Sequence, residues 1–267
     1  DVCAGERAVK AAETLYLPKL NASDASSDNA ERYQQYLLRA VFYAATQRTL
    51  QGLVGAVFAK EPMIELPAAL NYVEMNANNA GVSIFQQSQT VLAHVLKKGR
   101  HGLWVDYPNV EEETSRAAQS SVRPCVISLA AEQIRNWRVE DINGTQKLTL
   151  VVISESVEQR EGFELKYIPQ FRVLRLDGTY RVEIWRQKAN DVWSIEEEYE
   201  PEDGAGKPWS VIPFTFVGAQ NNDAEVDTAP MIDIARLNLA HYRNSADYED
   251  SAFFVGQAQS YITGLDE

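Results

Sequence analysis

The sequence is poor in cysteine and has no long apolar run. No stretch among its 267 residues approaches the ~20 consecutive apolar residues that a membrane-spanning helix needs, so we expect no association with a membrane. The only cysteines, Cys3 and Cys125, fit no metal-binding spacing. We expect two free thiols in a reducing cytoplasm, with a disulfide between them as the alternative.

Motifs that carry catalysis are also missing. The three histidines, His94, His101 and His241, have no nucleophile motif beside them. The sequence contains neither a His-Glu-x-x-His pair for zinc nor a glycine-rich phosphate loop. We therefore expect no catalytic residue, no cofactor and no bound metal, and the protein is predicted not to be an enzyme.

Positive charge is scarce as well. With 25 Lys and Arg against 38 Asp and Glu, the net charge is −13, which argues against wrapping of nucleic acid. The acidic surface either serves solubility or forms a wall that lets DNA pass without binding it. The runs at 111–113 and 196–198 are typical of solvated surfaces. Asp223, Glu225 and Asp227 alternate, and they either hold a divalent ion or flank the start of a helix.

What the sequence does contain is a change of period along the chain. In the first part of the chain, apolar residues recur every three or four positions, which predicts helices. Further along, apolar and polar residues alternate, which predicts strands, and Asp177-Gly178 between two of them predicts a hairpin turn. The expected helices cover residues 1–14, 30–58, 66–80, 83–98 and 130–137. The expected strands cover residues 103–107, 147–155, 163–168, 170–176, 180–187, 192–199 and 211–217.

A last helix follows these strands, and the whole order predicts an α+β fold. We expect a helical part at 1–100, a mainly antiparallel β part at 101–226 and a long helix at 227–267. The apolar stripe of that helix is Ile232, Ala235, Leu239, Tyr242 and Ala246. Its polar face is expected to carry Asp233, Arg236, Asn238, Arg243, Asp247 and Asp250.

Aromatic residues gather in the strand region. Trp104, Trp137, Trp185, Trp193 and Trp209 all lie in or beside expected strands, where packing in a core or a subunit interface is the usual role. A platform for stacking nucleic-acid bases needs interleaved cations, and four arginines approach that pattern: Arg172, Arg175, Arg181 and Arg186. We favour the alternative, in which these arginines form salt bridges with neighbouring subunits.

Several segments together resemble a known family. They are YLPKL at 16–20, YLLRAVFY at 36–43, LVGAVFAKEP at 53–62, GRHGLWVDYP at 99–108, RP at 123–124 and PMIDIARLNLAHYRNSADYED at 230–250. In this order they resemble the portal (head–tail connector) proteins of tailed bacteriophages, in a subgroup described only as a domain of unknown function. The resemblance runs from about residue 15 to the end of the chain.

The resemblance implies a structural subunit, with the helices and sheet as the outer wing and the last helix as the start of the stem. About twelve copies would form a ring at one capsid vertex of the virion, after synthesis in the bacterial cytoplasm. The implied partners are the major capsid protein, the terminase, tail or adaptor proteins, and double-stranded DNA passing through the channel.

Within such a ring we expect subunit or stem contacts from the polar side of the last helix, namely Arg236, Asn238, His241, Arg243 and Asp247. The family carries a clip, a second stem helix and a crown, so we expect this chain to be truncated relative to it. The alternatives are another head–tail component, such as an adaptor, and a hydrolase that uses paired carboxylates.

Overall fold

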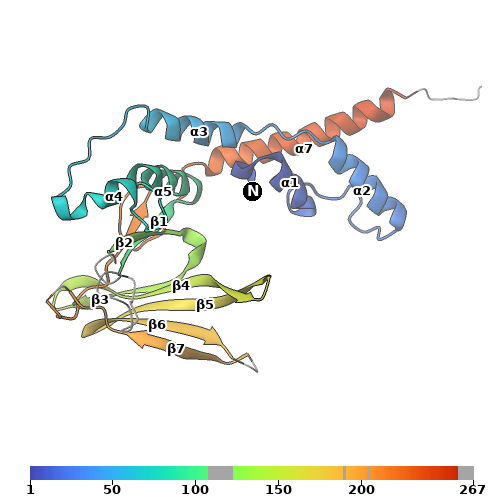
Figure 1. The fold of residues 1–267 in the computed structure, drawn as a ribbon. Helices are drawn as coiled ribbons and strands as arrows, with labels where there is room; N and C mark the ends of the chain where they lie inside the picture. Colours follow the sequence, from blue (N-terminus) through green and yellow to red (C-terminus); the bar gives the residue numbers. More distant parts are fainter. Residues whose placement is uncertain (108–122, 189–190, 204, 258–267) are drawn as a thin grey trace, which may run out of the picture. The chain divides into compact units, whose positions relative to one another are not determined.

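The computed structural model describes residues 1–107, 123–188, 191–203 and 205–257. In this part the chain is α+β, with six α-helices and two antiparallel sheets (Figure 1). It divides into two compact units, one formed by Asp1–Ala59 with Pro230–Glu267 and the other by Lys60–Ala229. The first helices therefore share a unit with the last one, a grouping that differs from the three consecutive parts expected from the sequence. None of the helices in the described ranges combines the length and apolar content that crossing a membrane requires.

The helical unit packs its short N-terminal helices and two longer helices against the last helix (Figure 1). Its helices are α1 (Glu6–Ala11), α2 (Ser27–Arg39), α3 (Ala45–Val57) and α7 (Ile232–Val255), with 3-10 turns at Val2–Ala4 and Glu13–Leu15. Tyr242 and Ala246 of α7 are fully buried, and they share a core with Tyr33, Tyr36 and Phe42. The expected apolar stripe of α7 is thus the face that packs.

The last helix is shorter than expected. It covers Ile232–Val255, which is 24 residues, whereas we expected a helix over 227–267. Residues 227–231 precede the helix, and the end of the expected range, 258–267, lies outside the described residues.

The expected single helix at 30–58 is wrong, because the chain breaks into α2 and α3 around an extended segment at 40–44. The periodicity on both sides is helical, so local sequence gave no reason for a break. The reason lies in α7, where Ser245 Oγ accepts a hydrogen bond from Val41 N at 3.2 Å and Asn238 Nδ2 donates one to the Tyr43 carbonyl at 2.8 Å. These side chains satisfy backbone groups that a continuous helix would have paired internally.

The second unit combines two helices with both sheets, whose inner faces share one core. Its helices are α4 (Tyr72–Met75) and α5 (Ile84–Lys98), with 3-10 turns at Ala68–Leu70 and Ala131–Gln133. The three-stranded sheet has the order β2-β1-β8, formed by β2 (Cys125–Ala130), β1 (Arg100–Asp106) and β8 (Phe214–Gly218). The five-stranded sheet is a meander of β3 (Ile134–Ile142), β4 (Thr145–Glu161), β5 (Glu164–Asp177), β6 (Thr179–Gln187) and β7 (Trp193–Tyr199).

Helix α5 lies where the sequence predicted it, because both of its ends are marked locally. Ser83 and Gln86 form a capping box at its start. Gly99 ends it in the left-handed conformation with φ +75°. A Cβ at Gly99 would lie 2.2 Å from the carbonyl oxygen of Asp227, so only glycine fits this close approach.

Two expectations for the sheet region are wrong. Residues 130–137 form one 3-10 turn followed by β3, because Ile134 and Trp137 pack into the core of the sheets. The strands expected at 163–168 and 170–176 are one strand, β5, which continues through Pro169. Proline is tolerated there because β5 pairs with β6 only from Gln170 onward. The Asp177-Gly178 hairpin is confirmed, since β5 and β6 pair up to Asp177↔Thr179.

Candidate functional site

Helix α7 carries all five residues that the sequence assigned to subunit contacts, and its inner face holds the helical unit together. Asn238 is only 5% exposed. Its Oδ1 accepts hydrogen bonds from the backbone N and from Oγ1 of Thr46, both at 3.0 Å. Asn238, which we expected on the polar face, therefore makes its contacts inside the helical unit.

Asn238 performs the task of a helix cap from a distant part of the chain. Ala44 occupies the N-cap position of α3 and makes no side-chain capping bond. The bond from Thr46 N to Asn238 is the bond that a local N-cap side chain usually accepts. The amide of Asn238 thus caps α3. It also bonds the carbonyl of Tyr43 in the extended segment before α3.

The C-terminal half of α7 is bound to α2 by charge. Asp250 is buried and pairs with Arg32 and Arg39, the latter at 2.9 Å. The pKa of Asp250 is held below its usual value, mainly by the hydrogen bond from Arg32 and to a smaller extent by the one from Arg39. The same two guanidinium groups stack on the rings of Phe254 and Phe253. Asp250, which we expected on the polar face, therefore makes its contacts inside the helical unit.

The remaining candidates divide between contacts inside the unit and open surface. Asp247 accepts a hydrogen bond from the Tyr36 hydroxyl at 2.5 Å, and Arg243 Nε donates one to the Tyr16 carbonyl at 2.8 Å. Arg236 is exposed and pairs only weakly with Asp233, one turn away on the same helix. His241 is exposed as well. Arg236 and His241 are therefore the candidates that face solvent most openly.

The outer face of α7 carries a second stripe that sequence reasoning missed. Exposed side chains recur at spacings of three and four, in the order Ile234, Leu237, His241, Asn244, Tyr248, Ser251 and Val255. Leu237 is 71% exposed, Tyr248 70% and Val255 82%. The spacing is that of a heptad seam, with apolar side chains near both ends of the helix and the polar residues His241, Asn244 and Ser251 between them. The stripe was overlooked because the buried stripe alone already explained an amphipathic helix.

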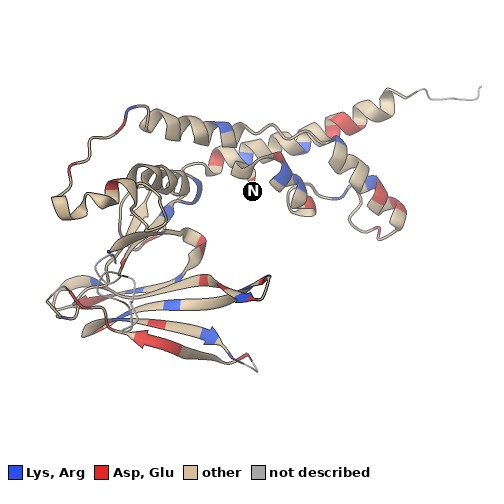
Figure 2. Cartoon of the chain, viewed as in Figure 1, with Lys and Arg blue, Asp and Glu red and all other residues tan. Residues whose placement is uncertain are grey.

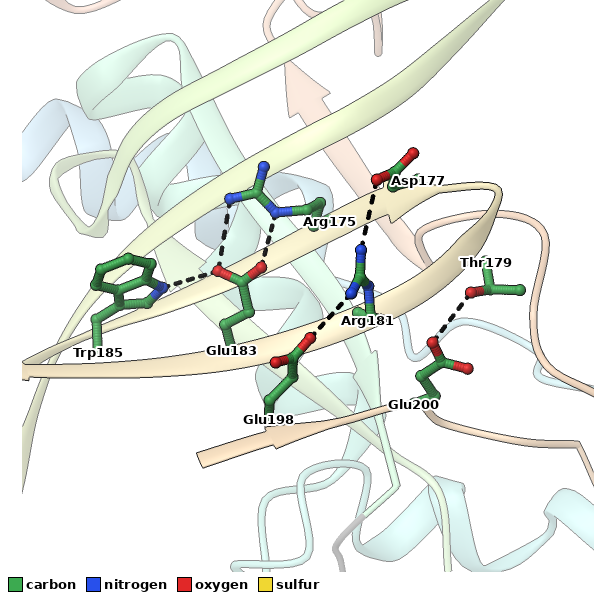
Figure 3. Close-up of polar contacts among 8 residues, drawn as sticks. All are labelled: Arg175, Asp177, Thr179, Arg181, Glu183, Trp185, Glu198 and Glu200. Carbon is green, nitrogen blue, oxygen red and sulfur yellow. Dashed lines mark hydrogen bonds and ion pairs between the residues drawn. The ribbon is translucent and has the colours of Figure 1, made fainter. Parts of the chain in front are cut away.

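The four arginines that the sequence analysis singled out bond to side chains of the five-stranded sheet, and Figure 3 shows Arg175 and Arg181 with their partners. Arg175 bonds Glu183 at 2.7 Å, and Arg181 bonds Glu198 at 3.0 Å. Arg172 binds Glu155 at 2.8 Å, and Arg186 Nε donates to Gln170 at 3.0 Å. Three of the four arginines thus form salt bridges inside the chain, whereas Arg186 bonds a neutral amide. These contacts leave the cations less available for nucleic acid.

The acidic runs lie at the edge of the sheet or outside the described residues. Glu196, Glu197 and Glu198 are exposed on the edge strand β7, where Figure 2 shows a continuous acidic stretch. Charge on an edge strand discourages further strand pairing. The run at 111–113 falls outside the described residues.

The acidic segment before α7 is organised by a cation of the protein itself. Arg100 donates to the carbonyl oxygens of Ala224 at 2.5 Å and of Glu225 at 2.9 Å. Asp227 accepts a hydrogen bond from Gln220 N at 2.8 Å. Within the described ranges, no three or more His, Cys, Asp or Glu side chains are grouped to hold a metal ion.

A buried polar pair escaped prediction. His101 of β1 is buried, and its Nε2 lies 2.6 Å from Ser128 Oγ of β2. Burial, with His94 and Lys97 nearby, lowers the pKa of His101 to about 4, so the imidazole is neutral at pH 7. The two residues are 27 positions apart in the sequence, and only strand pairing brings them together. Cys3 and Cys125 are both free thiols.

Comparison with known families singles out the helix just described. Residues 230–267 match the model of a domain of unknown function, DUF4055. The match includes the whole of α7 and therefore all five candidate residues. A search of curated proteins gives no match. The family match marks this segment as a recurrent module and assigns no activity to it.

Proposed function

We propose that this chain is a structural subunit of the portal ring of a tailed bacteriophage, and that the outer face of α7 packs against a neighbouring subunit. The observation that carries the proposal is the exposed stripe with Leu237, Tyr248 and Val255 on a helix whose other face is already buried. The resemblance of six segments along the chain, and the family match over α7, support the same assignment.

Burial of the outer stripe of α7 would stabilise an interface between subunits. Burying a large apolar side chain contributes about 1.5–3 kcal/mol, so the three exposed side chains contribute roughly 5–9 kcal/mol per interface. Association itself costs about 4–15 kcal/mol, so other contacts must add to those of the stripe. In a closed ring each subunit takes part in two such interfaces, since one face docks on a different face of its neighbour.

The acidic composition agrees with the proposed channel. A net charge of −13 disfavours tight binding of phosphate, and a portal must let double-stranded DNA slide in both directions. In this role the protein is not an enzyme and sits at the capsid vertex of the virion. It contacts the major capsid protein there, and it docks first the terminase and later the tail or its adaptors.

Substitution of the outer stripe tests the proposal. We expect Leu237→Arg to abolish rings while leaving the fold intact, because Leu237 is exposed in the single chain and a buried unpaired charge is costly in an interface. Leu165→Arg is the matched control, since Leu165 is 53% exposed on the five-stranded sheet. Negative-stain microscopy and analytical ultracentrifugation would compare the variants.

The outcomes separate the possibilities. Rings that persist in both Leu237→Arg and Tyr248→Arg contradict an α7 interface. Rings lost only in Leu165→Arg would place the interface on the sheet. Arg243 is a poorer probe than Arg236, because Arg243→Glu would also remove the bond to the Tyr16 carbonyl inside the unit.

A further inference from the structure

A cavity of about 440 Å³ opens within the second unit, at the end of β1 and the start of β6. Its walls are mainly aromatic rings and prolines, and three carboxylates complete the described lining. The residues involved are Val105, Asp106, Tyr107, Pro124, Tyr180, Pro201, Glu202, Asp203, Trp209 and Pro213. Neither the resemblance nor the family match over 230–267 assigns anything to this region.

The walls of the cavity are fixed before any ligand enters. Tyr180 is buried, its hydroxyl accepts a hydrogen bond from Trp104 Nε1 at 3.0 Å, and its N–H donates to the carbonyl of Trp209 at 2.8 Å. On the opposite side, Val105 N donates to the carbonyl of Pro213 at 2.9 Å. A site of this kind binds without first having to order its own backbone.

The acidic part of the lining is fixed too. Asp203 Oδ1 accepts backbone hydrogen bonds from Ala205 at 2.8 Å and from Lys207 at 3.0 Å, and these bonds hold the pKa of Asp203 below its usual value. The backbone of Glu202 forms a β-bridge with Pro208. Glu202 and Asp203 both line the cavity.

Asp106 is the third carboxylate and the least exposed one. Burial raises its pKa, and Arg172 opposes that rise. Arg172 itself binds Glu155 at 2.8 Å, and among the described residues Asp106 forms no ion pair. Asp106 is half-buried, and it also borders a neighbouring cavity that is lined by Arg172 and Arg186. A half-buried carboxylate without a direct ion pair is stabilised by a cation that comes within hydrogen-bond distance.

We propose that this cavity binds the arginine side chain of another protein chain. A guanidinium group is flat, which suits stacking on Tyr107 and Trp209, and its fork of N–H donors matches a carboxylate with two bonds. The described lining includes no Lys or Arg, and Arg172, whose charge acts on Asp106, is already paired with Glu155. The volume exceeds one side chain and admits the flanking peptide as well.

Isothermal titration calorimetry tests this with small probes on the whole protein. We expect N-acetyl-argininamide to bind with a dissociation constant on the order of 1 mM, because a single side chain provides few contacts. The citrulline analogue has nearly the same shape without the charge, and it should bind at least tenfold more weakly. The lysine analogue should also bind more weakly, since it lacks the planar fork.

Variants locate the binding. Asp106→Asn should weaken the arginine probe roughly tenfold or more. Glu202→Gln provides a second test should Asp106→Asn fail to fold. Glu164→Gln is the control, because Glu164 is an exposed carboxylate of β5 outside the cavity.

Three results would overturn the proposal. The first is equal binding of the arginine and citrulline probes, which would show that the charge of the ligand does not contribute to binding. The second is equal binding of the lysine probe, which would remove the guanidinium assignment. The third is arginine binding that survives both Asp106→Asn and Glu202→Gln. None of these results depends on whether the protein forms a ring, so this site and the proposed portal role fail separately.

Discussion

Single side chains of α7 determine how the N-terminal helices fold. Asn238 is the clearest case, because one buried amide caps α3 and bonds the break before it. Asp250 and Asp247 act similarly on α2 through Arg32, Arg39 and Tyr36. At the scale of residues, the polar groups of α7 are as much a part of the helical unit as its apolar stripe.

Replacing Asn238 by alanine should therefore destabilise the helical unit. The loss leaves the Thr46 hydroxyl, the Thr46 N–H and the Tyr43 carbonyl without this partner, and we expect the free energy of unfolding to fall by about 2–4 kcal/mol. Asn244→Ala on the exposed face of the same helix is the control and should change stability by less than about 0.5 kcal/mol.

Because the chain has two units, the effect of Asn238→Ala on the helical unit can be measured separately from its effect on the second unit. All five tryptophans lie between residues 104 and 209, which places them in the second unit. Urea unfolding followed by helical circular dichroism should shift in Asn238→Ala, whereas tryptophan fluorescence should shift little. An equal shift in both signals, or no shift in the first, would contradict the role given to Asn238.

The elements differ in how far the sequence predicts them, for a physical reason. Helix α5 and the β5–β6 hairpin were predictable because Ser83, Gly99 and Asp177-Gly178 mark their ends locally. The break at 40–44 was not predictable, because the groups that stabilise it come from the other end of the chain. Helical period alone cannot reveal a cap that only the tertiary fold supplies.

The candidate surfaces also differ in whether local sequence marks them. Periodicity correctly gave the buried face of α7, and the heptad spacing of Leu237 and Tyr248 was a signal that could have given the outer stripe. The cavity near Asp106 was beyond sequence reasoning, because its walls come from two strands and from the connections β1–β2 and β7–β8. The arginine pairs of Figure 3 likewise needed the strand register before they could be assigned.

The contact between β1 and β2 makes the second unit sensitive to acid. The pKa of His101 lies at about 4 in the folded chain, below the ordinary value of 6.5 expected after unfolding. Between these values the unfolded chain binds a proton that the folded chain does not. The stability is therefore fully present above pH ~6.5 and falls as the pH decreases towards 4, by up to about 1.4 kcal/mol per pH unit for this one group.

Fluorescence-monitored unfolding across that pH range checks this directly. His101→Gln should make the decline with acid shallower, even though it lowers stability at neutral pH by disturbing the Ser128 contact. His241→Gln, on the exposed face of α7, should keep the full slope. An unchanged slope in His101→Gln would show that other groups, such as His94 with its own lowered pKa, govern the acid response.

At the scale of the whole molecule, the chain forms two units, and the first of them is built from two separate stretches of sequence. The first 59 residues and the last helix fold together, and residues 60–229 form the unit inserted between them. Helix α7 is thus both the closing element of its own unit and the carrier of an exposed stripe. A helix of this kind is suited to transmit contacts between subunits, which is the central claim of the proposed portal role.

Negative-stain microscopy of the purified protein at its natural length, with rotational analysis of end-on views, tests that claim most directly. We predict closed rings with a central hole and about twelve-fold symmetry, which disappear in Leu237→Arg and persist in Leu165→Arg. Particles that remain single subunits at every protein concentration, or rings indifferent to Leu237→Arg, would contradict it.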